Sequence, residues 1–287
     1  MKIMTLNLRH DADRWPDRFG LVMQGVLAEL PDIIGFQEVA LAIEQAQTIA
    51  RAVNGYLSER PYRVFVEEKW SPQPREGVAI LTRDQVIESE RIELPEAGRI
   101  AQSIVIQRCR NRIGIINTHL HHLPKDDESI RLIQTRHLLA WVADRSSEVT
   151  SWILVGDLNA RPESETVKEV EKELVSAYKS VHGHEPSHTF PTPLVKEIGD
   201  WYQPRTLDYI FLTPWAFRAT QACLTFTRPH PQDPTLYASD HYGILAEVGC
   251  AEAEDGPKSD RARTEVLTTQ LMVRATAAPP ANSGSDS

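Results

Sequence analysis

The stretch from 153 to 162, ILVGDLNARP, begins as a strand with no polar face and ends in polar residues. Continuous apolar runs rich in β-branched residues are typical of strands covered on both faces, as in α/β proteins. Asp157 and Asn159 follow this run, two residues apart. Side chains at positions i and i+2 of an extended segment point the same way, so we expect both to converge at the rim of a sheet. That arrangement suits the binding of a phosphate, a metal or a water, and the stretch alone leaves all three open.

Polar side chains also lie at the ends of other apolar strands, or interrupt them, at Asn7, Glu38, Asn117, His119, Asp208, Asp240 and His241. Each alone has an ordinary structural explanation, as a turn residue, a helix N-terminal residue or a buried histidine. Asp208 within TLDYIFL resists that explanation, because an aspartate among apolar strand residues must be paired. As a set, the oxygen donors favour a hard ion, Mg²⁺ or Mn²⁺, over zinc. His119 and His241 add groups for proton transfer and charge stabilisation at a phosphoryl centre.

Helical and strand-like patterns alternate in two batches, with strand-rich stretches between them. Helical spacing is expected over 15–30, 41–53, 128–145 and about 164–178. Strands are expected at 2–8, 33–39, 63–67, 78–81, 86–89, 103–107, 112–118, 152–159, 206–212, 219–226 and 242–248. This order predicts one α/β domain over residues 1–250, in which two sheets pack together with helices outside.

The composition limits the class of protein. The chain has 287 residues, of which 41% are hydrophobic and 25% charged, an ordinary globular balance. Its net charge of −9 argues against a nonspecific nucleic-acid-coating protein, which needs a basic surplus, but not against an enzyme that places a cation at a phosphate. Residues 251–287 are rich in Ala, Glu, Ser and Pro and mostly aperiodic, which predicts a disordered C-terminal tail.

The cysteines and the N-terminus indicate a reducing environment. Three scattered cysteines without a CxxC pair predict neither a disulfide framework nor a thiolate zinc site. The first residues enter strand-like alternation without the apolar core of a signal peptide. No uninterrupted apolar stretch reaches the length of a transmembrane span. We therefore expect a cytoplasmic protein with no transmembrane segment, and we expect it to be a monomer.

Six short motifs also carry a resemblance to a known family: TLNLR, DIIGFQEV, INTHL, ILVGDLNARP, TLDYIF and SDHYGILAEV. In this order they resemble the endonuclease/exonuclease/phosphatase superfamily of metal-dependent phosphohydrolases, and the resemblance extends from residue 1 to about 248. It implies a four-layer α/β sandwich of two mixed β-sheets, face to face, with helices outside. It also implies Mg²⁺, with Mn²⁺ as a possible substitute, and a phosphoester substrate.

The resemblance further implies roles for individual residues at the metal. Glu38 would bind Mg²⁺, and Asn7 beside it would hold a metal-bound water or the phosphate. Asp240 would assist at the metal side. These three residues form the expected metal site.

Around the reacting phosphate, the resemblance assigns Asp157 and Asn159 to the attacking water and a phosphate oxygen. His119 would contact the scissile phosphate, oriented by Asp208. His241 would act as an acid or base, or would stabilise charge on the phosphate. These roles complete the acid–base set of a hydrolase.

Glu76 in REGVAILTR lies where deoxyribonuclease-like members place a carboxylate that pairs with the final histidine, here His241; a solvated glutamate at a strand start is the alternative. Two positions depart from the family pattern. Gly243 replaces a common proline, and Thr206 replaces a common basic residue, although Arg205 is adjacent. Neither departure removes a reacting group.

We therefore expect a Mg²⁺-dependent phosphoric-ester hydrolase, a phosphodiesterase acting on nucleic acid in the manner of an endo- or exonuclease. A phospholipid, inositol phosphate or other small phosphoester is the alternative substrate. A non-catalytic phosphate-binding scaffold is the alternative of another class. Trp70 and Trp201-Tyr202 are candidates for stacking on a base, and packing within the protein is the competing explanation for them.

Overall fold

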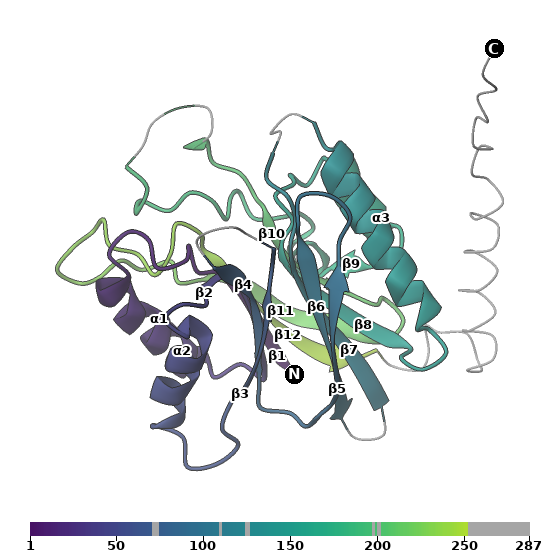
Figure 1. Cartoon of the computed structure of the whole chain (residues 1–287), viewed down its shortest axis with the longest axis horizontal. Coiled ribbons are helices and arrows are strands. Elements are labelled where there is room, and N and C mark those ends of the chain that lie inside the picture. The colour runs from purple at the N-terminus through teal and green to yellow at the C-terminus, as the bar shows by residue number, and fades with distance from the viewer. Residues whose placement is uncertain (71–74, 109–110, 124–126, 197–198, 200–201, 252–287) are drawn as a thin grey trace.

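Two six-stranded sheets pack face to face in the computed structural model of the chain (Figure 1). The structure describes residues 1–70, 75–108, 111–123, 127–196, 199 and 202–251. The predicted tail, 251–287, lies outside the described residues except for its first residue. The two mixed sheets with helices on their outer faces confirm the predicted α/β sandwich.

The first sheet has the strand order β11-β12-β1-β2-β4-β3. Its strands are β1 (Lys2–Asn7), β2 (Ile33–Ala40), β3 (Arg63–Glu68), β4 (Glu76–Thr82), β11 (Phe217–Thr225) and β12 (Gly243–Cys250). β1 and β2 run parallel, and the other neighbours are antiparallel. Strands from opposite ends of the described chain, β1 and β12, are therefore direct neighbours at the centre of this sheet.

The second sheet has the order β5-β6-β7-β8-β10-β9. Its strands are β5 (Val86–Glu93), β6 (Ile100–Arg108), β7 (Asn111–His119), β8 (Ser151–Asp157), β9 (Val175–Ser176) and β10 (Asp208–Leu212). β7 and β8 are parallel, and the remaining pairs are antiparallel. Both sheets thus place one parallel pair near their centre.

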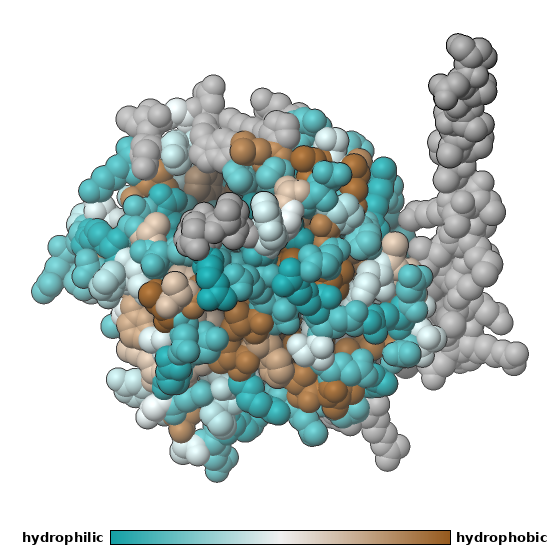
Figure 2. Space-filling model, viewed as in Figure 1, coloured by the Kyte–Doolittle hydropathy of each residue, from teal (hydrophilic) through white to brown (hydrophobic). Residues whose placement is uncertain are grey.

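Helices form the outer layers. The helices are α1 (Trp15–Glu29), α2 (Gln45–Asn54), α3 (Ser129–Asp144), α4 (Glu165–Glu171) and α5 (Ala177–His182). α1 and α2 cover the outer face of the first sheet, and α3 lies on the opposite side of the molecule, against the second sheet (Figure 1). Hydrophilic and hydrophobic residues are interspersed on the face shown in Figure 2.

The two faces of strand β8 pack into different parts of the core, which explains why its sequence has no polar face. Ile153 and Val155 belong to the core between the two sheets. Trp152 and Leu154 alternate with them and pack in the separate cluster beneath α3 and α4. Because both faces of this strand are covered, every position in it favours an apolar residue, as the sequence predicted.

One predicted helix is wrong in extent. Residues 164–178 form two short helices separated by β9 instead of one helix. Ser164 accepts a hydrogen bond from Val167 N, and Ser176 accepts one from Lys179 N, so each serine caps a separate helix. The second cap begins a new helix, α5, where the sequence predicted a continuous one.

A buried polar contact joins the two sheets. Asn117 on β7 donates from Nδ2 to the carbonyl oxygens of Phe36 and Ala79, both at 2.9 Å. Gln37 on β2 donates to Asn117 Oδ1 at 2.7 Å. Asn117 therefore has a structural role between the sheets, with its amide fully engaged.

Within the part of the chain that the structure describes, no helix combines the length and the hydrophobicity that crossing a bilayer requires.

Candidate functional site

Three polar side chains of the second sheet lie in one row across adjacent strands. His119 ends β7 and pairs in register with Asp157, which ends β8. Asp157 in turn pairs with Asp208, the first residue of β10. The row forms because the parallel strands β7 and β8 end at the edge where antiparallel β10 begins. The second sheet therefore brings an imidazole and two carboxylates to one edge.

The first sheet supplies Asn7 and Glu38. Asn7 ends β1, and its Nδ2 donates to Glu38 Oε1 at 3.1 Å and to Asp157 Oδ2 at 3.0 Å. Its Oδ1 accepts the backbone N–H of Arg9 at 2.9 Å. The Asn7 amide is thus engaged at both ends within the protein and holds two carboxylates from different sheets.

A local irregularity gives Glu38 its position. The pairing of β2 with β4 shifts register around this residue, and Glu38 has a left-handed φ of 49°. A bulge of this kind re-aims a side chain relative to a regular strand. The Glu38 carboxylate therefore faces the same space as Asp157 instead of following the alternation of β2.

The prediction that Asp157 and Asn159 extend from one straight segment is wrong in its geometry. β8 ends at Asp157, and Asn159 has a left-handed φ of 48°. Asp157 Oδ1 accepts the backbone N–H of Asn159 at 2.8 Å, which closes a turn. The Asn159 side chain donates to Leu120 O at 3.1 Å. Both residues line one cleft, but a side-chain-capped turn and not strand alternation places them there.

Asp208 orients a different histidine from the one expected. His241 Nδ1 lies 2.8 Å from Asp208 Oδ2, and both side chains are buried. The expectation that Asp208 orients His119 is therefore wrong, because His241 takes its hydrogen bond. His119 Nε2 lies 3.6 Å from Asp157 Oδ2 and 3.9 Å from Glu38 Oε1. His241 Nε2 lies 4.0 Å from the same Asp157 oxygen, so Asp157 is flanked by two imidazoles.

The two remaining predicted carboxylates, Asp240 and Glu76, also line the cleft, each beside a cation. Asp240 forms an ion pair with Arg9 and accepts the Ser239 hydroxyl at 3.1 Å. Glu76 Oε1 lies 2.6 Å from Lys69 Nζ. Glu76 therefore has Lys69 as its partner among the described residues, which corrects the expected pairing with His241.

Of the cations around these carboxylates, sequence reasoning noted Arg205 and missed the other three. Arg9, Lys69, Arg99 and Arg205 line the cleft together with the predicted side chains. Arg9 follows Asn7 by two residues, a spacing that gives a usable signal. Lys69 and Arg99 lie just outside the ends of β3 and β6, where the sequence shows no periodic pattern. Positive side chains among the carboxylates give the cleft hydrogen-bond donors that suit an anionic group.

A buried arginine organises the loop that carries Arg9. The Arg18 side chain on α1 is completely buried. Its guanidinium donates to the backbone carbonyls of Leu8, Arg9, His10, Ala12, Asp13 and Ala238. Burial lowers the pKa of Arg18 to about 10, so it stays protonated at neutral pH. Arg18 therefore fixes the loop after β1 and the segment that leads to Asp240.

Aromatic rings border one side of the cleft. The ring centroid of Phe190 lies 4.9 Å from that of His241, and Tyr202 lines the cleft nearby. Trp70 is 71% exposed and follows the cleft residue Lys69. Trp201 lies outside the described residues.

The protonation states of Asp157 and His241 are strongly shifted. Burial, followed by the charge of Asp208, raises the pKa of Asp157 to about 7. Burial opposes the charging of His241, but the carboxylates of Asp208 and Asp240 outweigh it and raise the pKa of His241 to about 10. At neutral pH His241 is therefore an imidazolium, and the Asp157 carboxyl is partly protonated and partly ionised.

His119 and Glu38 are both shifted toward their neutral forms. Burial, and then the charges of Arg99 and Lys69, lower the pKa of His119 well below its usual value. Burial, and then the charges of Glu76 and Asp240, raise the pKa of Glu38. Carboxylates that repel one another in this way gain stability from a cation placed between them.

Two groups of side chains fit a metal ion. Ligand atoms of Asp157, Asp208 and His241 all lie within 4.8 Å of one another, although Asp208 and His241 already bond each other. The second group consists of Glu38 and Asp157, whose carboxylates share the Nδ2 donor of Asn7. The oxygen donors, and the charges of Glu76 and Asp240 that raise the pKa of Glu38, make Glu38 in this second group the better match for a hard divalent cation.

Comparison with known proteins adds independent findings. The model of the endonuclease/exonuclease/phosphatase family matches residues 4–241. Nocturnin from Homo sapiens is 27% identical over 274 residues, which cover 86% of this chain and 61% of that protein. Nocturnin from Xenopus laevis is 28% identical and covers 84% of this chain and 66% of that protein. The chain thus spans less than two thirds of the length of these relatives.

Solved structures share the fold. The human Nocturnin catalytic domain with bound sulfate superposes with a TM-score of 0.70 at 23% identity, covering 88% of this chain and 94% of that chain. A conserved protein of unknown function from Enterococcus faecalis gives 0.68 at 24% identity, with 87% and 100% coverage. A mannosyl-6-phosphatase from Bacteroides thetaiotaomicron gives 0.69 at 19% identity, with 87% and 99% coverage.

Proposed function

The chain belongs to the endonuclease/exonuclease/phosphatase family, and we propose that it is a Mg²⁺-dependent hydrolase that cleaves a phosphoric ester with a water activated at Asp157. One observation carries this proposal. Asp157 lies between His119 and His241, while Asp208 holds His241 from behind. A base flanked by two imidazoles of opposite protonation state suits proton transfer at a phosphate.

Glu38 would hold the Mg²⁺, with Asp240 at the edge of the site. The raised pKa of Glu38 supports this assignment, because crowded carboxylates at a cleft are relieved by a cation. A bound Mg²⁺ supplies a Lewis acid that polarises a phosphoryl oxygen. Asn7 positions the carboxylates of Glu38 and Asp157 through its two hydrogen bonds.

Asp157 accepts the proton of the attacking water. Its pKa of about 7 matches that task near neutral pH, where an effective base must exchange protons readily. The backbone N–H of Asn159 fixes the other carboxylate oxygen, so one oxygen of Asp157 faces the cleft. The Asn159 carboxamide, which also lines the cleft, stands beside the phosphate.

The two histidines act on the phosphate from different protonation states. His241 is an imidazolium, and its Nε2–H donates to a phosphoryl oxygen, where negative charge increases during the reaction. His119 is neutral and donates one N–H to the same phosphate. Asp208 acts through His241, whose ring it orients and whose charge it sustains.

For the substrate, the first candidate is a phosphodiester in nucleic acid. Trp70 supports it, because an exposed indole next to the cleft residue Lys69 offers a surface for base stacking. The second candidate is a small phosphoester. The net charge of −9, with arginines gathered at the cleft, supports a compact anionic substrate.

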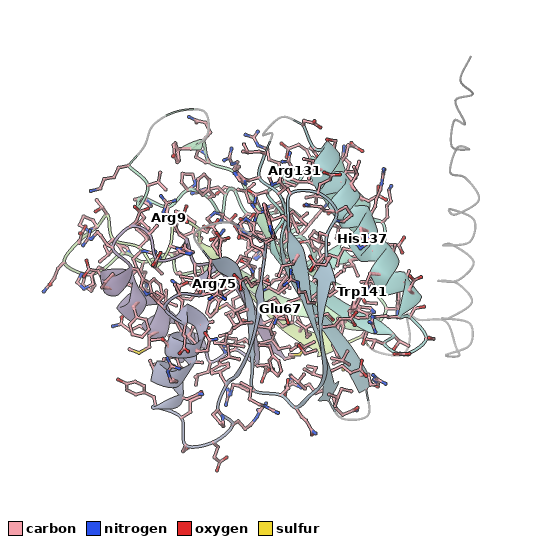
Figure 3. The ribbon with its side chains drawn as sticks, in the orientation of Figure 1. Arg9, Glu67, Arg75, Arg131, His137 and Trp141 are labelled. Atoms are coloured by element: carbon pink, nitrogen blue, oxygen red, sulfur yellow. The ribbon has the colours of Figure 1, made fainter. Side chains whose placement is uncertain are left out.

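The decisive experiment measures hydrolysis of bis(p-nitrophenyl) phosphate and p-nitrophenyl phosphate in Mg²⁺, Mn²⁺ or EDTA. We expect turnover that requires metal and falls at least about 10³-fold in His241→Ala. His137→Ala is the matched control, since His137 is exposed on α3, away from the cleft residues (Figure 3). Full activity of His241→Ala would refute the proposal.

Substrate class follows from the same assay. Preference for the diester supports nuclease-like activity, which oligonucleotide cleavage then tests directly. Preference for the monoester supports a small phosphoester. Metal-independent binding of phosphate without turnover of either ester would instead support the scaffold hypothesis.

A further inference from the structure

A second pocket opens beside the cleft and shares four residues with it: His122, Asn159, Arg205 and Leu207. Its remaining walls come from the start of α3 and from the segment between β8 and α4. A ligand whose phosphate lies at Asp157 therefore has a direct path into this second pocket. We call it the arginine pocket.

Three arginines line the arginine pocket: Arg131, Arg161 and Arg205. Arg131 is 2% exposed and donates to two backbone carbonyls at 3.3 and 3.1 Å. Arg205 is 9% exposed, and its guanidinium lies 5.2 Å from the ring centroid of Phe190. Arg161 is exposed at the pocket rim. Two of the three cations are thus held in place before any ligand binds.

Two acidic residues, Glu128 and Glu163, also line the arginine pocket. Glu128 Oε2 accepts hydrogen bonds from both N and Oγ1 of Thr166, each at 2.9 Å, and is directed to the start of α4. Glu163 is exposed. Among the residues that the structure describes, Arg161 has no ion-pair partner.

Like charges lie close together in the arginine pocket. Burial lowers the pKa of Arg205, and the nearby charge of Arg161 lowers it further. Two guanidinium groups that repel each other at the wall of one pocket are stabilised by an anion between them. Guanidinium matches phosphate through paired N–H donors, which makes phosphate the anion of choice.

We infer that the arginine pocket binds a second phosphate of the substrate, so that this enzyme acts on phosphoric esters that carry two phosphate groups. The inference rests on the proposed function, because the first phosphate must lie at Asp157 and His241. The second phosphate comes either from the next linkage of a polynucleotide or from the far end of a small bisphosphorylated molecule. Both sources present the same group to Arg161 and Arg205.

Isothermal titration of the full chain in EDTA tests the inference without turnover. One ligand pair is glucose 1,6-bisphosphate against glucose 6-phosphate, and the other is 5′-phosphorylated dTpdT against dTpdT. We expect the ligand with the additional phosphate to bind about tenfold more tightly in at least one pair. A gain in the dinucleotide pair identifies a polynucleotide source, and a gain in the sugar pair identifies a small molecule.

Arg161→Gln should reduce this gain to less than about threefold, and Arg161→Lys should keep part of it, because lysine retains the charge without the paired donors. Arg51→Gln is the matched control, since Arg51 is an exposed arginine on α2 that pairs with Glu44. Equal affinities within both pairs would overturn the inference, as would a gain that Arg161→Gln leaves intact. Hydrolysis of bis(p-nitrophenyl) phosphate reports separately on the proposed function, so the two failures are distinguishable.

Discussion

Asp208 and His241 share a hydrogen bond of 2.8 Å although 33 residues separate them in the chain. Asp208 begins β10 in the second sheet, and His241 lies just before β12 in the first sheet. The bond therefore crosses between the sheets, as the bond from Asn7 to Asp157 also does. The geometry of the cleft depends on how the two sheets are placed relative to each other.

Asp208→Asn should lower kcat by about 10²- to 10³-fold while the fold is retained. The substitution removes the carboxylate charge that raises the pKa of His241 to about 10, so that pKa should fall. An NMR titration of the His241 ring protons measures the shift directly, and Asp144→Asn, at an exposed aspartate on α3, is the control. An unchanged His241 pKa in Asp208→Asn would contradict the assigned role.

Mg²⁺ should raise the Tm strongly at pH 8 and little at pH 5. The raised pKa of Glu38 means that a proton occupies this carboxyl at low pH and must leave before a metal binds. At a hundredfold excess over Kd the ligand stabilises the fold by about 2.7 kcal/mol. Thermal melts at both pH values test this. Glu38→Gln should lose the increase and Glu44→Gln should keep it, whereas equal shifts at pH 5 and pH 8 would rule out the assigned ligands.

Gly156→Ala should destabilise the protein by about 2–4 kcal/mol. Gly156 has a φ of 142°, and a Cβ there would lie 2.0 Å from the carbonyl oxygen of Thr118 on the neighbouring strand. Urea unfolding measures the loss. Gly20→Ala is the matched control, because a Cβ at this position in α1 meets nothing within 4 Å, and we expect it to stabilise the helix by about 0.5–1 kcal/mol. If the two variants were equally stable, the backbone at Gly156 would have to move away from Thr118 in solution far enough to accommodate a Cβ.

Arg18→Met should reduce the free energy of unfolding by about 3 kcal/mol, because it leaves several buried carbonyls without a donor. It should also raise KM for bis(p-nitrophenyl) phosphate, since the loop that carries Arg9 loses its anchor. Urea unfolding and steady-state kinetics provide the two readouts, with Arg51→Gln as the control. A stable variant with unchanged KM would show that the loop holds its shape without Arg18.

The sequence was sufficient to predict the fold and the identity of most polar residues at the cleft. Apolar runs such as 153–155 indicate strands covered on both faces, and this pattern follows from burial alone. Asp208 was recognised because an aspartate inside an apolar strand needs a partner. Its partner, His241, lies on the other sheet, and no pattern along the chain reports contacts between sheets.

Local backbone irregularities at the cleft were also not predicted from the sequence. The bulge at Glu38 and the turn at Asn159 both have left-handed φ values, which strand periodicity does not predict. Two of the cations were missed for a different reason. Lys69 and Arg99 lie outside regular strands and helices, so their position depends on the packing of loops.

The pairing of β1 with β12 has a consequence for synthesis on the ribosome. Residues 2–7 emerge early, but their neighbour at 243–250 is made only after every other described strand. Asp240 and His241 immediately precede that neighbour. A nascent chain therefore carries Asn7 and Glu38 for most of its translation without His241, and the cleft is complete only after the last described strand has joined the first.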